Sequence, residues 1–142
     1  MRYFVDTNVL FYAYDRKDRT RHRVASDCLR QLWATGSGVT SVQVLKEFYV
    51  NATRPHGLMT PAEARSVIGT YLGWPVQPLE PTDVLQAAEI QERNRISFWD
   101  ALVVLAAKQL GAEVLLTEDL NHGQRIEGLQ VHNPFLDEPL PQ

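Results

Sequence analysis

The acidic residues that could do chemistry lie far apart in the sequence but occupy comparable positions in the expected elements. Asp6 and Asp119 closely follow short apolar runs, at 3–5 and 113–117, that are typical of strands. Asp100 lies at the start of an apolar helical segment, and Glu47 lies beside the apolar stripe of another. Two unit charges 4 Å apart repel by about 4 kcal/mol at an effective dielectric near 20. Four carboxylates in one cleft would therefore need a counter-charge, which a hard divalent cation with oxygen ligands supplies.

Taken singly, each of these acids also has an ordinary structural explanation. An aspartate after a strand commonly caps the next helix or makes a turn, which would account for Asp6 and Asp119. Asp100 fits a capping box that begins at Ser97, and a carboxylate there gains from the helix dipole. Glu47 lies off the apolar stripe of its helix and could be a solvated surface residue. No single position decides between structure and catalysis.

The elements that must position these acids alternate along the chain, mostly one strand to one helix. Strands are expected at 3–5, around 39, and at 76–79, 113–117 and 129–132, and helices at 21–34, 40–53, 60–74, 81–95 and 97–111. Thr40 followed by Gln43 has the spacing of a capping box. The alternation predicts an α/β fold, a parallel sheet of about five strands with helices on both faces. In such sheets ligands bind outside the carboxyl ends of the strands.

The four acids, in their order and with their flanking residues, resemble those of the PIN-domain nucleases, and among them the VapC-type toxins of toxin–antitoxin pairs. The resemblance rests on Asp6-Thr7-Asn8, Gln43-x-Leu45-x-Glu47, Ser97–Ala101 and Leu115–Gly123. It extends from Met1 to about Pro134, so we expect a PIN-like nuclease domain at 1–134 and a Pro-rich tail at 135–142. It implies a three-layer α/β/α PIN-like fold.

The resemblance also implies a function. It is that of a metal-dependent endoribonuclease, in which a four-carboxylate pocket holds Mg²⁺ or Mn²⁺ and hydrolyses RNA phosphodiester bonds. The implied catalytic residues are Asp6, Glu47, Asp100 and Asp119. Asp6 and Asp100 are the expected direct metal ligands. The other two acids could bind through water, complete a second metal site or orient the nucleophile.

Further expectations follow from the same resemblance. Asn8 and Thr117 match the supporting polar positions of the family. Such toxins are held by a small antitoxin protein that inhibits the acidic pocket, and they usually form homodimers. Members cleave transfer, ribosomal or messenger RNA, and this sequence contains no base-reading motif that would select among them.

Positive charge is concentrated in residues 15–23. The basic residues there are Arg16, Lys17, Arg19, Arg21 and Arg23. Because the segment should leave the sheet close to Asp6, it could form a phosphate-binding rim beside the acids. A solvated loop and helix start explains the same charges equally well. Trp99, beside Asp100, is expected in the core rather than as a platform for base stacking.

Composition limits the other possibilities. The 142 residues include 17 acidic and 14 basic side chains, a net charge of −3, so bulk positive charge cannot attract a polyanion. The single cysteine, Cys28, excludes an intramolecular disulfide framework and a multi-cysteine zinc site. No signal-peptide pattern is visible, and the longest apolar run, 101–107, is far shorter than a membrane span. We therefore expect a cytoplasmic protein that does not bind membranes.

Two other functions remain open from the sequence. A phosphatase with an aspartyl nucleophile would also begin with an aspartate after the first strand. Such an enzyme usually has a second acid two residues later, where this chain has Asn8. A non-catalytic, acidic α/β regulatory or binding module would need no metal chemistry at all.

Overall fold

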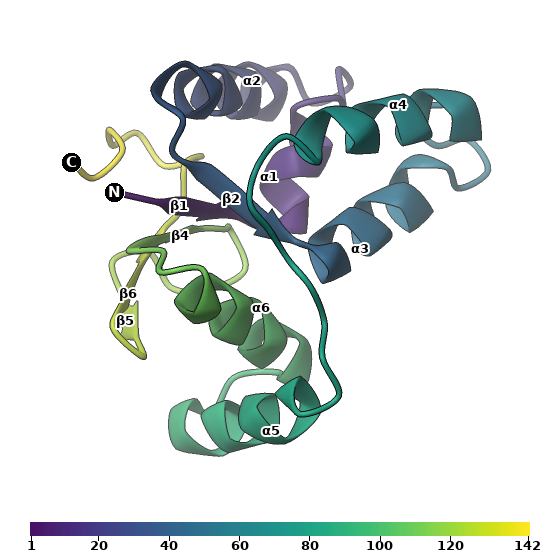
Figure 1. Cartoon of the computed structure of the whole chain (residues 1–142). Helices are drawn as coiled ribbons and strands as arrows, with labels where there is room; N and C mark the ends of the chain where they lie inside the picture. The colour runs from purple at the N-terminus through teal and green to yellow at the C-terminus, as the bar shows by residue number, and fades with distance from the viewer.

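Strands and helices alternate along most of the chain (Figure 1). The computed structural model describes residues 1–142. The strands are β1 (Tyr3–Val5), β2 (Gly38–Ser41), β3 (Val76–Gln77), β4 (Val114–Leu116), β5 (Arg125–Ile126) and β6 (Leu129–His132). The helices are α1 (Thr7–Tyr12), α2 (Arg19–Thr35), α3 (Val42–Ala52), α4 (Pro61–Tyr71), α5 (Asp83–Asn94) and α6 (Phe98–Gln109).

The strands form one sheet in the order β3-β2-β1-β4-β6-β5. All neighbouring pairs are parallel except β5 with β6. In the central strand, Phe4 pairs with Val39 on one side and Leu115 on the other, and these three residues are at most 1% exposed. The chain passes from β1 to β2 in one direction and reaches β4 on the opposite side. The carboxyl end of β1 is therefore the switch point at which such sheets bind ligands.

Helices cover both faces of this sheet, which confirms the predicted three-layer α/β/α fold. Figure 1 shows α1 to α4 on one side of the sheet and α5 with α6 on the other. Helix α6 packs against the sheet, and α5 packs against α6. Every residue of the run 101–107 of α6 is buried, as expected for a helix that is apolar nearly all round.

The sheet has six strands rather than about five, and a short helix follows Asp6 that the sequence pattern does not reveal. The additional strand β5 forms a hairpin with β6 through Glu127 and Gly128, whose φ angles are 51° and 85°. Two successive positive φ angles are typical of the type I′ turn that suits a two-residue hairpin. The usual Asn-Gly or Asp-Gly signal is absent here. At the other edge, β3 is limited to two residues between Pro75 and Pro78.

The expected capping box at Thr40 is wrong by one residue. Ser41 is the N-cap of α3, and its hydroxyl accepts from the N–H of Val44 at 3.2 Å. Thr40 belongs to β2 instead, and its buried hydroxyl donates to the carbonyl of Val5 at 3.0 Å. The strand thus extends further than the single residue expected around 39, because a side-chain hydrogen bond to β1 favours the extended conformation.

The C-terminal segment packs back onto the domain. Phe135 meets Tyr12 edge-on with ring centroids 5.4 Å apart, and the Tyr3 hydroxyl donates to the carbonyl of Pro141. The division at 134/135 stays a prediction. No helix in the structure has the length and apolar character needed to cross a membrane.

Candidate functional site

Asp6 and Thr117 join the carboxyl ends of β1 and β4. Asp6 is the N-cap of α1, where its Oδ1 accepts from the N–H of Thr7 at 2.7 Å. Its Oδ2 accepts from the Thr117 hydroxyl at 2.8 Å. Burial raises the pKa of Asp6 to about 7, against these two hydrogen bonds and with help from the negative charges of Asp119 and Glu47. Without a cation, the Asp6 carboxyl group is therefore easily protonated near neutral pH.

Glu47 faces the site rather than bulk solvent. Its Oε2 accepts from the hydroxyl of Thr7 at 2.8 Å, and its Oε1 accepts from the side-chain amide of Gln43 at 3.0 Å. Gln43 lies one helical turn earlier in α3, and Thr7 begins α1. Because α1 packs against α3, Glu47 is brought to the helix that Asp6 caps.

Asn8 fixes the loop that carries Asp119. Its Nδ2 donates to Oγ1 of Thr117 at 3.1 Å and to Oδ2 of Asp119 at 3.0 Å. Its Oδ1 accepts from the N–H of Glu118 at 3.3 Å. The Thr117 hydroxyl also accepts from the N–H of Asp119 at 3.1 Å. The two polar residues expected to support the site thus connect Asp119 to Asp6.

Asp100 comes from the opposite layer. Ser97 caps α6, and its hydroxyl accepts from the N–H of Asp100 at 3.0 Å. Burial raises the pKa of Asp100, the Ser97 hydroxyl lowers it, and the charges of Asp119 and Glu47 raise it. Asp100 and Asp6 therefore respond to the same two neighbouring carboxylates. All four predicted acids belong to one electrostatic cluster.

The donors in this cluster have the chemistry of a site for Mg²⁺ or Mn²⁺. Oxygen ligands are those that hard divalent cations prefer. The pKa of Asp6 is raised to about 7 mainly by burial and further by the charges of Asp119 and Glu47, and a bound cation would favour its ionised form. No three acidic, histidine or cysteine side chains are already arranged to hold an ion. Both oxygens of Asp6 and of Glu47 accept protein hydrogen bonds. Each carboxylate oxygen has a further lone pair, so the residues fit a cation although their positions are not yet those of ligands.

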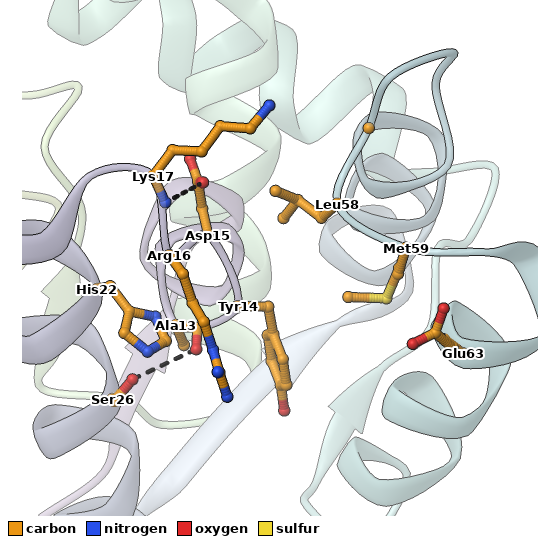
Figure 2. Close-up of a pocket in the computed structure, with 11 residues that line it drawn as sticks. Ala13, Tyr14, Asp15, Arg16, Lys17, His22, Ser26, Leu58, Met59 and Glu63 are labelled. Carbon is orange, nitrogen blue, oxygen red and sulfur yellow. Dashed lines mark hydrogen bonds between the residues drawn. The ribbon is translucent and has the colours of Figure 1, made fainter.

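The basic residues of 16–23 do not form one patch. Arg16 and Lys17 line a cavity of about 770 Å³ between the α1–α2 and α3–α4 loops (Figure 2). Lys17 also lines a second cavity of about 580 Å³, which contains Glu47 and Asp119 and which we call the acidic cavity. Arg23 lines a cavity beside the C-terminal segment, and Arg19 is exposed at the start of α2.

Arg21 is held by protein groups. Its Nε donates to Oε2 of Glu118 at 3.1 Å, and its Nη1 donates to Oδ2 of Asp18 at 3.3 Å. The guanidinium carbon lies 5.4 Å from the ring centroids of both Tyr12 and Phe135. These contacts tie α2 to the loop after β4 and to the C-terminal segment.

Two cationic residues near the acids do not stand out in the sequence. Arg54 lines the acidic cavity, although the sequence around it indicates only the end of a helix. Arg95 lines a separate cavity of about 350 Å³ with Asp100 and Asp119. Neither lies at a spacing that would have suggested a site. The expectation that Trp99 belongs to the core is wrong, because it is 64% exposed on the first turn of α6.

Comparisons with solved structures agree with the fold. The toxin VapC20 of Mycobacterium tuberculosis, described as cleaving the sarcin–ricin loop, matches at 24% identity over 80% of this chain and 86% of its own, with a TM-score of 0.61. A toxin–antitoxin complex from Klebsiella pneumoniae matches at 17% identity over 94% and 98%, with a TM-score of 0.67. DNA-bound VapBC from Salmonella typhimurium has the same identity and coverage and a TM-score of 0.65. At these identities the likeness concerns the fold.

No protein with a curated function matches the chain significantly. The family model of the PIN domain matches residues 3–126. This span contains every strand but β6, all six helices and the four acids. The chain therefore belongs to the PIN domain family.

Proposed function

We propose that this protein is a metal-dependent endoribonuclease and the toxin of a toxin–antitoxin pair. The proposal rests mainly on the continuous hydrogen-bonded path from Asp6 through Thr117 and Asn8 to Asp119. Such a path keeps carboxylates close together that would otherwise repel one another. Membership of the PIN family and the likeness to a toxin that cleaves the sarcin–ricin loop support RNA as the substrate.

The residues of the site have different roles in the proposed hydrolysis. Asp6 and Asp100 would hold Mg²⁺ or Mn²⁺, with Glu47 and Asp119 as further ligands, directly or through water. The ion would polarise a phosphoryl oxygen and lower the pKa of a bound water. Thr7 and Thr117 keep the Asp6 carboxylate oriented.

Asp119 is the best placed of the four to handle the attacking water. It is exposed, and only its Oδ2 accepts a hydrogen bond from another side chain, that of Asn8. Its Oδ1 is free to orient the water and accept its proton as the oxygen attacks phosphorus. The bond from phosphorus to the leaving oxygen would then break, and that oxygen would take up a proton from solvent water.

The direct test is cleavage of a defined RNA pool by the purified protein, with Mg²⁺ or Mn²⁺ against EDTA and with the product ends mapped. We expect internal cuts that require the ion and that vanish in Asp100→Asn. Lys46→Gln is the matched control, since this exposed neighbour of Glu47 lines neither cavity beside the acids. Cleavage that persists in EDTA, or in Asp100→Asn, would contradict the proposal.

The proposed partner is a small antitoxin that fills the acidic cavity with a basic group. Three solved neighbours are toxin–antitoxin complexes, which supports this choice. We further propose that the protein works in the cytoplasm as a homodimer. A short DNA-binding protein encoded in the adjacent reading frame should co-purify with the chain and suppress cleavage, and sedimentation of the free chain would measure the dimer.

The alternative functions make different predictions. Asn8 supplies no second acid for an aspartyl phosphatase, and its side chain donates two hydrogen bonds and accepts one in holding the loop after β4. Trapping of a phospho-aspartate at Asp6 would nevertheless favour that class. A non-catalytic module would bind its partner and would not cleave RNA, whichever metal ion is supplied.

A further inference from the structure

Two cavities meet at Asp119 and belong to opposite layers of the fold. The acidic cavity, about 580 Å³, is lined from α1, α3 and the α3–α4 loop, and it includes Arg54. The second, about 350 Å³, is lined from the α5–α6 turn and the loop after β4, and it includes Arg95 and Asp100. Figure 1 shows α3 and the α5–α6 pair on opposite sides of the sheet. A linear ligand that passes over Asp119 can therefore occupy both cavities.

Each cavity contains an arginine that the protein leaves free. Arg54 and Arg95 are exposed, and neither side chain forms an ion pair or a hydrogen bond within the protein. Arg21 and Arg93, by contrast, are paired with Glu118 and Glu127. Each of these two arginines shares its cavity with two of the four acids and forms an ion pair with neither. They are available for phosphate, which a guanidinium binds with two parallel hydrogen bonds.

The backbone is unusual at Arg95 and close to Arg54. Arg95 ends α5 in the left-handed region, with φ 54°, and its N–H donates to the carbonyl of Gln91 at 2.9 Å. Glycine or asparagine is the usual residue at such a helix end. His56, two residues after Arg54, has φ 61°. Strained backbone persists where its surroundings fix it and is concentrated at ligand sites.

We propose that an RNA strand crosses the carboxylates from one cavity to the other. Arg54 then binds a phosphate on one side of the scissile bond, and Arg95 binds a phosphate on the other. This inference rests on the proposed nuclease function and names the two residues that position its substrate. The four carboxylates would bind the scissile phosphate only through their metal ion, whereas the two arginines contact the phosphates on either side of it. Asp119 lines both cavities, so a single-stranded or looped RNA that passes over this residue would reach both arginines.

The first test measures RNA binding without cleavage, in an Asp6→Asn background. The logarithm of the binding constant falls with the logarithm of salt concentration by about 0.7 per phosphate contact on a single strand. Arg54→Ala and Arg95→Ala should each make this slope less negative by about 0.7, and the double variant should show both changes. Arg95→Gly removes the same side chain and suits the positive φ, so it should match Arg95→Ala. Arg65→Ala, an exposed arginine that lines neither cavity, should leave the slope unchanged.

The second test assigns the two sides, with cleavage-competent protein and two shortened RNAs that lack the nucleotides 5′ or 3′ of the mapped cut. With one of the two shortened RNAs, each arginine variant should cleave as well as the wild type does. The RNA that removes the difference should not be the same for the two variants. The proposed RNA path would be overturned if the arginine variants kept the salt slope of their Asp6→Asn parent, or if both variants responded to the same shortened RNA. Cleavage by the wild type would still support the nuclease function in that case. If the wild type cuts no RNA in Mg²⁺ or Mn²⁺, the nuclease function itself fails, and the path fails with it.

Discussion

The Thr117 hydroxyl donates to Oδ2 of Asp6 over 2.8 Å, and through this bond the end of β4 is fixed against the end of β1. Thr117 is completely buried and Asp6 is 5% exposed, so water cannot replace the donor. The same hydroxyl accepts from the N–H of Asp119. One oxygen atom thus sets the positions of two of the four acids.

Replacing that hydroxyl should weaken the metal site. Thr117→Val keeps the shape of the side chain but leaves Asp6 and the N–H of Asp119 without their partner. We expect Mn²⁺ affinity to fall about 10–100-fold, as is typical when a hydrogen bond that orients a ligand is lost. Titration calorimetry with Mn²⁺ measures the change. Thr117→Ser should retain most of the affinity, and equal affinities in the valine and wild-type proteins would refute the positioning role.

Asp6→Asn should abolish cleavage and leave the metal-free protein as stable as the wild type or more stable. The pKa of Asp6 rises from 3.8 to about 7 on folding, so between those values the folded state binds more protons than the unfolded state. Wild-type stability in EDTA therefore decreases as pH rises through this window, by an amount on the order of a few kcal/mol, and the variant lacks this decrease. Urea unfolding at pH 4.5 and 7.5 compares them. A stability difference that does not grow with pH would be inconsistent with the buried charge.

Arg21→Gln should affect the fold more than RNA binding. Its contacts with Glu118 and Asp18 are internal, so the salt dependence of RNA binding should stay unchanged. Loss of the partly exposed ion pairs should lower stability by about 1 kcal/mol. Thermal unfolding and a salt titration of RNA binding measure the two effects. Lys17→Gln provides the comparison. Lys17 lines the acidic cavity, so its loss should make the salt dependence of RNA binding less steep.

Two glycine-to-alanine changes should have opposite effects on stability. A Cβ at Gly38 would lie 2.4 Å from Cζ2 of Trp74, whose ring is packed against Trp33 and Tyr71. Gly38→Ala should therefore destabilise the protein by about 1–3 kcal/mol. Gly69, inside α4, has open space around it, so Gly69→Ala should stabilise by roughly 0.5–1 kcal/mol. Denaturant midpoints of the two variants would show whether the signs differ.

Asp6 and Thr117 could be placed from the sequence because short apolar runs fix where β1 and β4 end. Glu47 could not be placed in the same way. Its orientation depends on the packing of α3 against α1, and α1 follows Asp6 with too few residues to show a helical period. The resemblance to the PIN family supplied Glu47 instead. The helix end at Arg95 was predicted, but its place beside Asp100 and Asp119 was not, because it depends on how the turn between α5 and α6 lies against the loop after β4.

The two edges of the sheet have a consequence for how other molecules can approach. Strand β3 offers two residues between prolines, and β5 offers two residues at the opposite edge. A peptide that binds by adding a strand needs a longer row of unpaired backbone groups than either edge provides. We therefore expect any partner to recognise side chains on helices and loops, and such short edges also disfavour edge-to-edge aggregation.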